Sequence, residues 1–263
     1  EPVKMTIDVN ALPPATAIPQ GAVNVQVEGH AVQNIPLDER GHAVYLTDDL
    51  EVGNQLITIS FAGDNKFNRS SKSFYQYVGK TEATLALSSS ENPSFFGKAP
   101  EIMARVSSEI KERIPTGEIQ FQVDGRNAGA PVPLNVQGEA RKNISGLTAG
   151  RHVINALYSG DVHFYDTNVA LFQQVNQETA KSVLTSSENP SVYGPNVTFT
   201  DTVTSEYAIP AGTVEFLING TPVSKQNLDE AGKANYTVFN IDAGKYAITA
   251  NYAENRDFKG SSA

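Results

Sequence analysis

The chain of 263 residues contains no cysteine and carries a formal net charge of −9 at pH 7. The lack of cysteine excludes disulfides, thiolate metal sites and a cysteine nucleophile, and the acidic balance argues against a nucleic-acid partner, because phosphate binding needs clustered Lys and Arg. No apolar run is long enough to cross a bilayer, so we expect no membrane insertion by this segment and place any export signal or anchor outside it.

Short alternating runs of apolar and polar residues predict an all-β chain. Hydrophobic residues make up 40% of the sequence, which is enough for packed cores, and 20 Gly and 14 Pro indicate many turns. No long stretch has the 3.6-residue period of a helix. The length suits two or three domains of ordinary size.

After a first predicted strand at 3–9, the chain enters a segment that occurs three times. Its copies begin at Ile18, Ile114 and Ile209, which are 96 and 95 residues apart. Each copy continues as an alternating strand into a turn, and a fixed period of this kind indicates tandem structural repeats. The copies read IPQGAVNVQVEG from 18, IPTGEIQFQVDG from 114 and IPAGTVEFLING from 209.

The downstream half of each copy repeats as well. A leucine is followed four residues later by glycine, and a second glycine precedes a strand that ends in an aromatic residue. In repeats two and three this residue is a tyrosine, at the place where sandwich domains often use one to tie back a corner. The aligned residues are Leu37, Leu134 and Leu228; Gly41, Gly138 and Gly232; Gly53, Gly150 and Gly244; and Phe61, Tyr158 and Tyr252.

The second and third copies open with a shared block, SSENPSFFG at 89–97 and SSENPSVYG at 186–194. Because Pro cannot donate to a ladder, Asn-Pro-Ser predicts a break within or after a first edge strand. Between two later strands, the Gly-Asp pairs that end at Asp64 and Asp161 predict ordinary turns, and the third copy has Glu254-Asn255 there.

The pattern SSxNPSxxG, IPxGxVxF and LxAGxHxIxAxYxGDxxF resembles the bacterial Ig-like domain of group 3, over nearly the whole chain. The resemblance implies an all-β fold of three tandem immunoglobulin-like β-sandwich domains in an elongated array, each with about seven strands. We name the copies repeat 1 (1–78), repeat 2 (79–176) and repeat 3 (177–263). Repeat 1 is expected to lack its first strand, the counterpart of 81–98, and repeat 3 its last, the counterpart of 169–175.

These incomplete ends predict a monomeric fragment of a longer array. The alternative is strand exchange, in which a neighbouring chain completes an open sandwich. A self-polymerising subunit needs a spare strand, whereas this sequence has lost one at each end without gaining another. We therefore reject strand exchange as the main function.

No pattern predicts catalytic, cofactor-binding or metal-binding residues, and we expect neither enzyme activity nor a cofactor. The sequence contains no Gly-x-Ser-x-Gly elbow, P-loop or His-Glu-x-x-His. The acidic groups Asp48-Asp49-Glu51 and Asp201 with Glu206 favour solvated loop charge over weak calcium binding, because no calcium loop surrounds them. Four histidines form no pair at metal spacing. They are His30, His42, His152 and His163.

The resemblance implies a non-catalytic stalk or spacer segment of a bacterial cell-surface or secreted adhesin-type protein, which projects another module from the envelope. Its expected partners are neighbouring Ig-like repeats of the same parent chain, and its expected location is extracellular or at the bacterial surface. An alternative is a binding module that recognises a glycan or host surface protein through sandwich-end loops, at 126–133 or 13–19. A second alternative is a structural repeat of an S-layer or phage particle.

Overall fold

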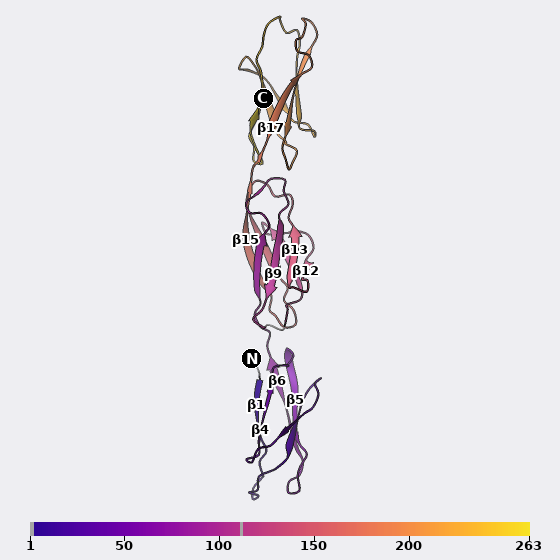
Figure 1. Cartoon of the computed structure of the whole chain (residues 1–263), viewed down its shortest axis with the longest axis vertical. Coiled ribbons are helices and arrows are strands. Elements are labelled where there is room, and N and C mark those ends of the chain that lie inside the picture. Colours follow the sequence, from indigo (N-terminus) through magenta and orange to yellow (C-terminus); the bar gives the residue numbers. More distant parts are fainter. Residues whose placement is uncertain (1–2, 111–112) are drawn as a thin grey trace. The chain divides into compact units, whose positions relative to one another are not determined.

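The computed structural model describes residues 3–110 and 113–263, and every regular element within these ranges is a β-strand (Figure 1). The chain divides into two compact units. Unit 1 comprises Glu1–Glu82 with Asp161–Tyr165, and unit 2 comprises Ala83–Gly160 with Asp166–Ala263. Within the described ranges no helix is long and apolar enough to span a membrane.

Two antiparallel sheets form the sandwich of repeat 1. Its strands are β1 (Val3–Asp8), β2 (Ala22–Val27), β3 (Gln33–Pro36), β4 (His42–Thr47), β5 (Gly53–Phe61) and β6 (Ser70–Val78). One sheet pairs β1 with β4, and the other has the order β3–β2–β5–β6. Among the described strands, none pairs with the second edge of β1, where β7 and β17 stand in the other repeats.

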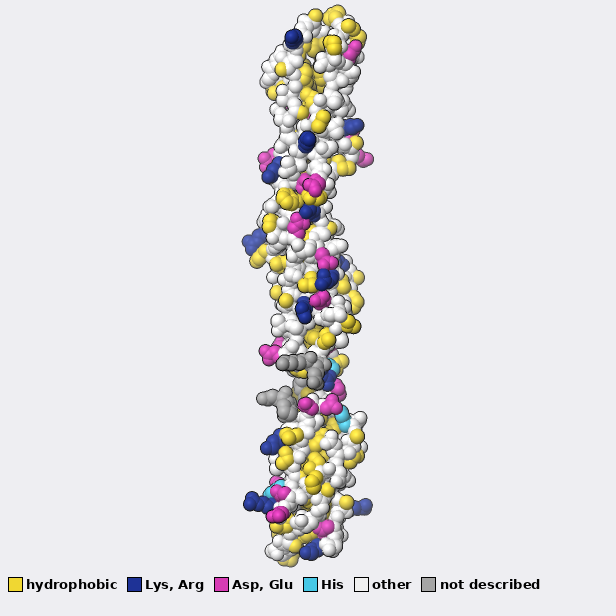
Figure 2. Space-filling view, in the orientation of Figure 1, with side chains coloured by type: hydrophobic (Ala, Val, Ile, Leu, Met, Phe, Trp, Pro, Cys, Tyr) yellow, Lys and Arg dark blue, Asp and Glu magenta, His cyan; other side chains and the backbone are white. Residues whose placement is uncertain are grey.

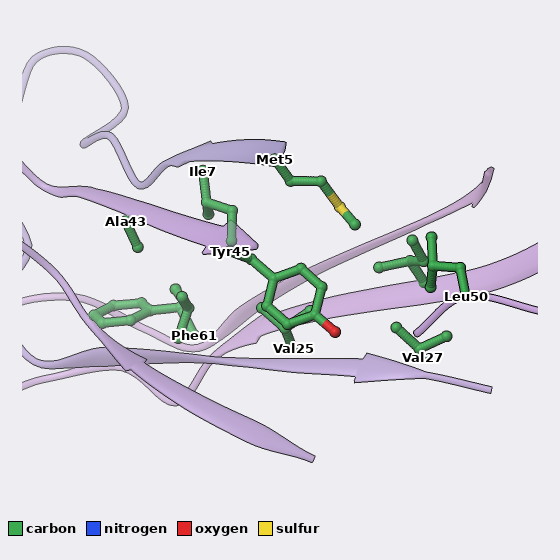
Figure 3. Close-up of a cluster of buried hydrophobic side chains, with 10 residues drawn as sticks. Met5, Ile7, Val25, Val27, Ala43, Tyr45, Leu50 and Phe61 are labelled. Carbon is green, nitrogen blue, oxygen red and sulfur yellow. The ribbon is translucent and has the colours of Figure 1, made fainter. Parts of the chain in front are cut away.

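The core of repeat 1 lies between these sheets because its strands alternate apolar and polar residues. Val23, Val25 and Val27 on β2 are at most 2% exposed. Burying each such side chain contributes roughly 1.5–3 kcal/mol. Figure 3 shows the ring of Tyr45, from β4, in the middle of the cluster, close to Val25 and below Met5. An aromatic ring therefore fills the centre of this sandwich.

Repeat 2 also forms two sheets. One has the order β13–β9–β7 and the other β11–β10–β14–β15–β8, with β12 pairing with β10. These strands are β7 (Thr84–Ser89), β8 (Ser94–Phe95), β9 (Glu101–Ser107), β10 (Glu118–Val123), β11 (Arg126–Asn127), β12 (Val132–Pro133), β13 (Glu139–Asn143), β14 (Gly150–Tyr158) and β15 (Thr167–Asn176).

The SSENPSFFG block carries the chain from one sheet of repeat 2 to the other. Strand β7 pairs with β9, whereas β8 pairs in parallel with the end of β15. Between them, the Asn92 amide donates to Phe172 O at 2.7 Å and accepts from Gln174 N at 3.0 Å. The break predicted at Asn-Pro-Ser is confirmed, and it is a change of sheet.

Repeat 3 follows the same plan, with sheets β17–β18–β21 and β20–β19–β22–β24 and a short pair β16–β23. Its strands are β16 (Glu178–Thr179), β17 (Lys181–Ser186), β18 (Val197–Thr204), β19 (Thr213–Ile218), β20 (Thr221–Asn227), β21 (Lys233–Val238), β22 (Ile248–Tyr252), β23 (Phe258–Lys259) and β24 (Ser261–Ser262). Strand β24 pairs with β22 as the first residues of β15 pair with β14. Ser261 and Ser262 are therefore the counterparts of Thr167 and Asn168, and the expectation about the counterpart of 169–175 stays a prediction.

One turn recurs in all three repeats and explains the conserved spacing from leucine to glycine. In repeat 2, Asn135 Oδ1 accepts hydrogen bonds from the backbone N–H groups of Gln137 and Glu139, each at 2.9 Å. Gly138 closes this turn at φ 74°, where a Cβ would lie 2.5 Å from Val106 O. Only glycine fits without displacing backbone. The equivalent pairs are Asp38 with Gly41 and Asp229 with Gly232.

The surface of each unit carries charges of both signs. On the face shown in Figure 2, basic and acidic side chains are interspersed within each unit.

The all-β fold predicted from the sequence is confirmed by this structure. The domain boundaries proposed after residues 78 and 176 stay predictions.

Candidate functional site

Two tyrosine hydroxyls tie back a corner of their sandwiches, as the sequence predicted. Tyr158 donates a hydrogen bond to Thr116 O at 2.6 Å, and Tyr252 donates to Ala211 O at 2.8 Å. Both rings are 2% exposed. Phe61, the equivalent residue in repeat 1, has no hydroxyl to donate. These residues join the strand end to the loop before the IPxG strand, and this role is structural.

The Gly-Asp pairs are turns, which confirms their interpretation from the sequence. Asp64 Oδ1 accepts from the backbone N–H groups two and three residues further on, at 2.7 and 2.8 Å. Asp161 Oδ1 does the same at 2.8 and 2.9 Å. In repeat 3, Asn255 Oδ1 accepts the equivalent pair at 2.9 and 3.0 Å. An amide oxygen therefore replaces the carboxylate without loss of the turn.

Within unit 2, the loop after β8 of repeat 2 reaches the core of repeat 3. Phe96 packs against the buried cluster of repeat 3 and meets Phe258 edge-on, with ring centroids 5.2 Å apart. The Lys98 ammonium lies 4.5 Å from the centre of the Tyr207 ring. Gly97, between them, approaches so closely that a Cβ would lie 2.7 Å from Tyr207 O. A side chain of repeat 2 thus completes part of the core of repeat 3.

Polar contacts join the same two repeats. The backbone N–H of Ala149 donates to Asp257 Oδ1 at 2.8 Å, and the Gln177 amide donates to Asn255 O at 2.7 Å. Glu178 is 5% exposed and its N–H donates to Asp257 O at 2.8 Å. The contact of Ala149 with Asp257 therefore crosses between the repeats, and the other two hydrogen bonds hold residues 177 and 178 to repeat 3.

A polar cleft lies at one end of the repeat 2 sandwich. It has a volume of about 630 Å³ and opens between the β10–β11 hairpin and the segment that follows β13. This volume is within the usual range for small-ligand sites, roughly 300–1,000 Å³. Residues with polar side chains dominate its lining. They are Asp124, Arg126, Asn127, Lys142, Asn143 and Ser145.

Two cations line this cleft without an acidic partner. The Lys142 ammonium is 3.5 Å from Ala130 O and close to Gly129, where a Cβ would lie 3.2 Å from Nζ. Arg126 is exposed. Within residues 3–110 and 113–263, neither cation forms an ion pair, and Arg126 makes no hydrogen bond through its guanidinium. Both therefore retain their capacity to bind an anion.

The acid of the cleft, in contrast, is satisfied. Asp124 accepts hydrogen bonds from Val153 N at 2.9 Å and pairs with His152 Nδ1 at 2.7 Å. The Val153 hydrogen bond first, and then His152, lower the pKa of Asp124. His152 Nε2 lies 2.8 Å from Thr148 O, so both ring nitrogens face oxygen acceptors. The protein itself therefore already engages the Asp124 carboxylate.

The cleft coincides with a change of residue between repeats. Lys142 pairs with Ile102 across β13 and β9, at the register position that Tyr45 holds in repeat 1 and Tyr236 in repeat 3. Tyr45 is 5% exposed, and the Tyr236 ring lies 5.7 Å from that of Phe216. Where the other repeats place an aromatic ring in the core, repeat 2 places a lysine whose charge reaches solvent.

The two loops proposed for binding have different outcomes. The cleft includes residues 126–128 of the predicted loop 126–133, together with residues 142–147, which sequence reasoning missed. An alignment of the three copies would have shown that Lys142 occupies the position of Tyr45 in repeat 1 and of Tyr236 in repeat 3. In the loop 13–19 of repeat 1, residues 13–18 are exposed and Pro19 is buried.

The histidines do not come together. His30 lies 3.9 Å from Asp49, and His42 pairs with Asp8. In unit 1, His163 contacts Glu51 at 3.0 Å, next to a bridge between Thr81 and Phe164. The described residues contain no cluster of three or more acidic or histidine side chains suited to a metal ion.

The interpretation of Asp201 as solvated loop charge was wrong. Asp201 lies within β18, is completely buried and accepts a hydrogen bond from Ser182 Oγ at 3.1 Å. Its Oδ1 has no hydrogen-bond partner among the described residues. Burial raises the pKa of this carboxyl, and Glu206 is exposed elsewhere. The alternation of β18 places Asp201 on the buried face. Sequence reasoning missed this because an acidic residue normally indicates solvent exposure.

A family model described as bacterial Ig-like domain (group 3) matches residues 87–176 and 184–263. A solved tetra-tandem repeat in the extending region of a large adhesion protein shares 13% identity over 94% of this chain and 66% of that chain, with a TM-score of 0.48. FdeC, an Escherichia coli adhesin, shares 13% identity over 90% and 82%, with a TM-score of 0.32. The I9–I11 tandem of titin shares 12% over 99% and 90%, with a TM-score of 0.30. No curated protein sequence matches the chain.

Proposed function

The chain belongs to the family of bacterial Ig-like domains of group 3, and we propose on this basis that it is a spacer segment of a bacterial surface or secreted protein. In this proposal the repeats are non-catalytic and hold another module of the parent protein away from the cell envelope. Their partners are the neighbouring repeats of the same chain, and the segment itself is monomeric and extracellular.

The observation that carries this proposal is the insertion of Phe96 into the core of repeat 3. A spacer resists bending only if its repeats cannot swing freely, and interfaces within a chain that are small and polar normally permit such motion. Here an aromatic contact, a cation–π contact and the hydrogen bond from Ala149 to Asp257 act together between the two repeats of unit 2. Aromatic pairs contribute about 0.5–1.5 kcal/mol beyond the burial of their area.

Each repeat also has the internal packing expected of a structural element. Its core residues are packed between sheets, and its polar turn residues are occupied by backbone hydrogen bonds. In Asp38, Asn135 and Asp229, the side-chain oxygen serves a turn. These side chains stabilise the backbone of the turns, which supports a structural role for the repeats.

The spacer proposal is testable by a measurement of height above a surface. The chain has no cysteine, so single cysteines at the equivalent exposed positions Glu39, Val136 and Glu230 each give one specific dye site. With the N-terminus tethered, we expect the dye height to increase from each site to the next in steps on the order of 30 Å, the length of a nine-residue strand. Equal heights for the three dyes would overturn the proposal.

A second candidate function, ligand binding, is favoured by the cleft of repeat 2. Its loops lie at one end of the sandwich, where such folds commonly place binding residues. The cleft does not compete with the spacer role, because a repeat in a spacer also presents its loops to solvent.

A further inference from the structure

We propose that the end cleft of repeat 2 binds an acidic saccharide, whose carboxylate is held by Lys142 and Arg126. This inference is independent of the spacer role. It rests on the cleft itself, on two cations that lack acidic partners, and on the loss of a core tyrosine at this place.

The charged side chains of the cleft favour an anionic ligand. In a chain of net charge −9, the cleft carries two cations and one carboxylate. That carboxylate, on Asp124, already accepts from Val153 N and faces His152. Lys142 and Arg126 are therefore the side chains of the cleft that attract an anion. Hydrogen bonds between charged partners are about twice as strong as those between neutral groups.

Lys142 occupies a core position, where a lysine buries less apolar surface than the tyrosine of the other repeats. Ala140 and Ile144, on the same face of the strand, are 2% and 3% exposed, so Lys142 leaves the backbone toward the core. A tyrosine at this position fills the centre of repeat 1, as Figure 3 shows for Tyr45. A lysine forgoes that apolar burial, while its stem packs inward and its ammonium reaches the cleft. Packing alone does not favour this residue.

The uncharged polar side chains of the cleft indicate the class of ligand. Asn143 and Ser145 make no side-chain hydrogen bond within the described ranges, and the Asn127 amide uses only its oxygen, which accepts from Gln122 at 3.0 Å. Free amides and a hydroxyl both donate and accept, which matches the vicinal hydroxyls of a sugar. Among the described residues that line the cleft, none has an aromatic side chain on which a ligand could stack. A peptide would instead seek an apolar anchor pocket or a free strand edge.

The test compares two sugars that differ only in the acid. The full chain is titrated with methyl β-D-glucuronide and with methyl β-D-glucoside at constant ionic strength, and amide chemical shifts are followed by NMR. We expect the glucuronide to shift amides at 124–128 and 142–147 and to bind about tenfold or more tightly than the glucoside. Equal binding of the two sugars, or shifts confined to other residues, would overturn the proposal.

Variants separate the cleft from the rest of the surface. Lys142→Tyr gives repeat 2 the residue of the other repeats and should abolish binding, and Arg126→Gln, at an exposed position, should weaken it about tenfold without affecting the core. Lys225→Gln, which removes an exposed lysine of repeat 3, is the matched control and should bind as the native chain does. Undiminished binding by both Lys142→Tyr and Arg126→Gln would contradict the assignment.

Two further ligands test the chemistry. Inorganic phosphate and an acidic tripeptide are titrated under the same conditions. We expect neither to displace the glucuronide at equal concentration. Displacement by phosphate would identify a general anion site, and displacement by the peptide a peptide site, and either result overturns the saccharide assignment. The surface-height experiment is unaffected by all of these outcomes, so the two proposals fail separately.

Discussion

A buried carboxyl group distinguishes the core of repeat 3. Asp201 holds the register position of Ala104 in repeat 2 and Ile7 in repeat 1, all three of which are buried. Its only side-chain partner among the described residues is Ser182, whose hydroxyl also contacts Ser261. A buried acceptor without a partner costs about 1–3 kcal/mol. This residue therefore reduces the stability of its own sandwich.

We predict that Asp201→Ala, which supplies the residue of repeat 2, stabilises repeat 3 at pH 7 by about 1 kcal/mol or more. Burial raises the folded-state pKa of Asp201 above the ordinary 3.8. The native chain should therefore lose stability as pH rises from about 3.8 through that raised pKa, and remain at the lower level above it. Because the variant lacks this dependence, its advantage should be smallest near pH 4.

The measurement is hydrogen exchange of β18 and β21 amides, with native and variant chains compared at each pH. Asp242→Ala removes an exposed acid from the same repeat and is the control, for which we expect no change beyond about 0.5 kcal/mol. If Asp201→Ala instead exchanges faster at pH 7, the carboxyl contributes more than its burial costs, and our explanation is wrong.

At the scale of elements, the recurring turn before β4, β13 and β21 sets where each strand begins. An Asx side chain organises the first part of the turn, and a glycine closes it against the backbone of the neighbouring strand. In repeat 2 the N–H of Val106 donates to Gly138 O at 2.8 Å. Two requirements act on Gly138, a positive φ and a lack of space for Cβ.

We predict that Gly138→Ala and Gly125→Ala separate these two requirements. Both glycines have positive φ, at 74° and 79°, but only Gly138 has backbone within reach of a Cβ. Gly125→Ala should cost about 1 kcal/mol from the left-handed conformation alone. Gly138→Ala should cost at least about 1 kcal/mol more, because the turn must also move away from Val106. Urea unfolding followed by circular dichroism measures the difference, and equal losses would show that contact with Val106 is unimportant.

The repeat period and strand alternation were sufficient to predict these elements from the sequence. The IPxG strand and the tyrosine corner occur where the spacing placed them, since each depends on local backbone geometry. The change of sheet at Asn-Pro-Ser was predicted only as a break, because pairing of β8 with β15 joins residues about 80 positions apart. Sequence patterns do not contain such distant partners.

The cleft and the buried acid were harder to predict for a common reason. Lys142 and Asp201 are charged residues on strands, and their residue types alone indicate solvent exposure. Only the register shows that they occupy core positions, which are aromatic or aliphatic in the other repeats. A comparison of the three repeats by register would therefore have identified both positions as exceptions to the repeat pattern.

At the scale of the whole molecule, unit 2 joins two repeats through side chains that belong to one repeat and pack in the other. Phe96 lies at the end of the block that also forms β8, so one segment both closes repeat 2 and contacts repeat 3. Removal of this ring exposes part of the core of repeat 3 without changing either sheet. The effect should therefore appear in the stability of repeat 3 and in the coupling between the two repeats.

We predict that Phe96→Ala lowers the free energy of unfolding of repeat 3 by about 1–2 kcal/mol, from lost burial and the lost contact with Phe258. Phe95→Ala is the matched control, because Phe95 is the preceding residue and is 38% exposed. We expect it to cost about 0.5 kcal/mol or less. Hydrogen exchange should show faster opening at 205–208 and 255–258 in Phe96→Ala alone, and NMR relaxation should show the two repeats tumbling more independently. Equal behaviour of the two variants would mean that the hydrogen bond between Ala149 and Asp257, rather than Phe96, holds the two repeats together, and the structural basis for the spacer would then lie in that contact.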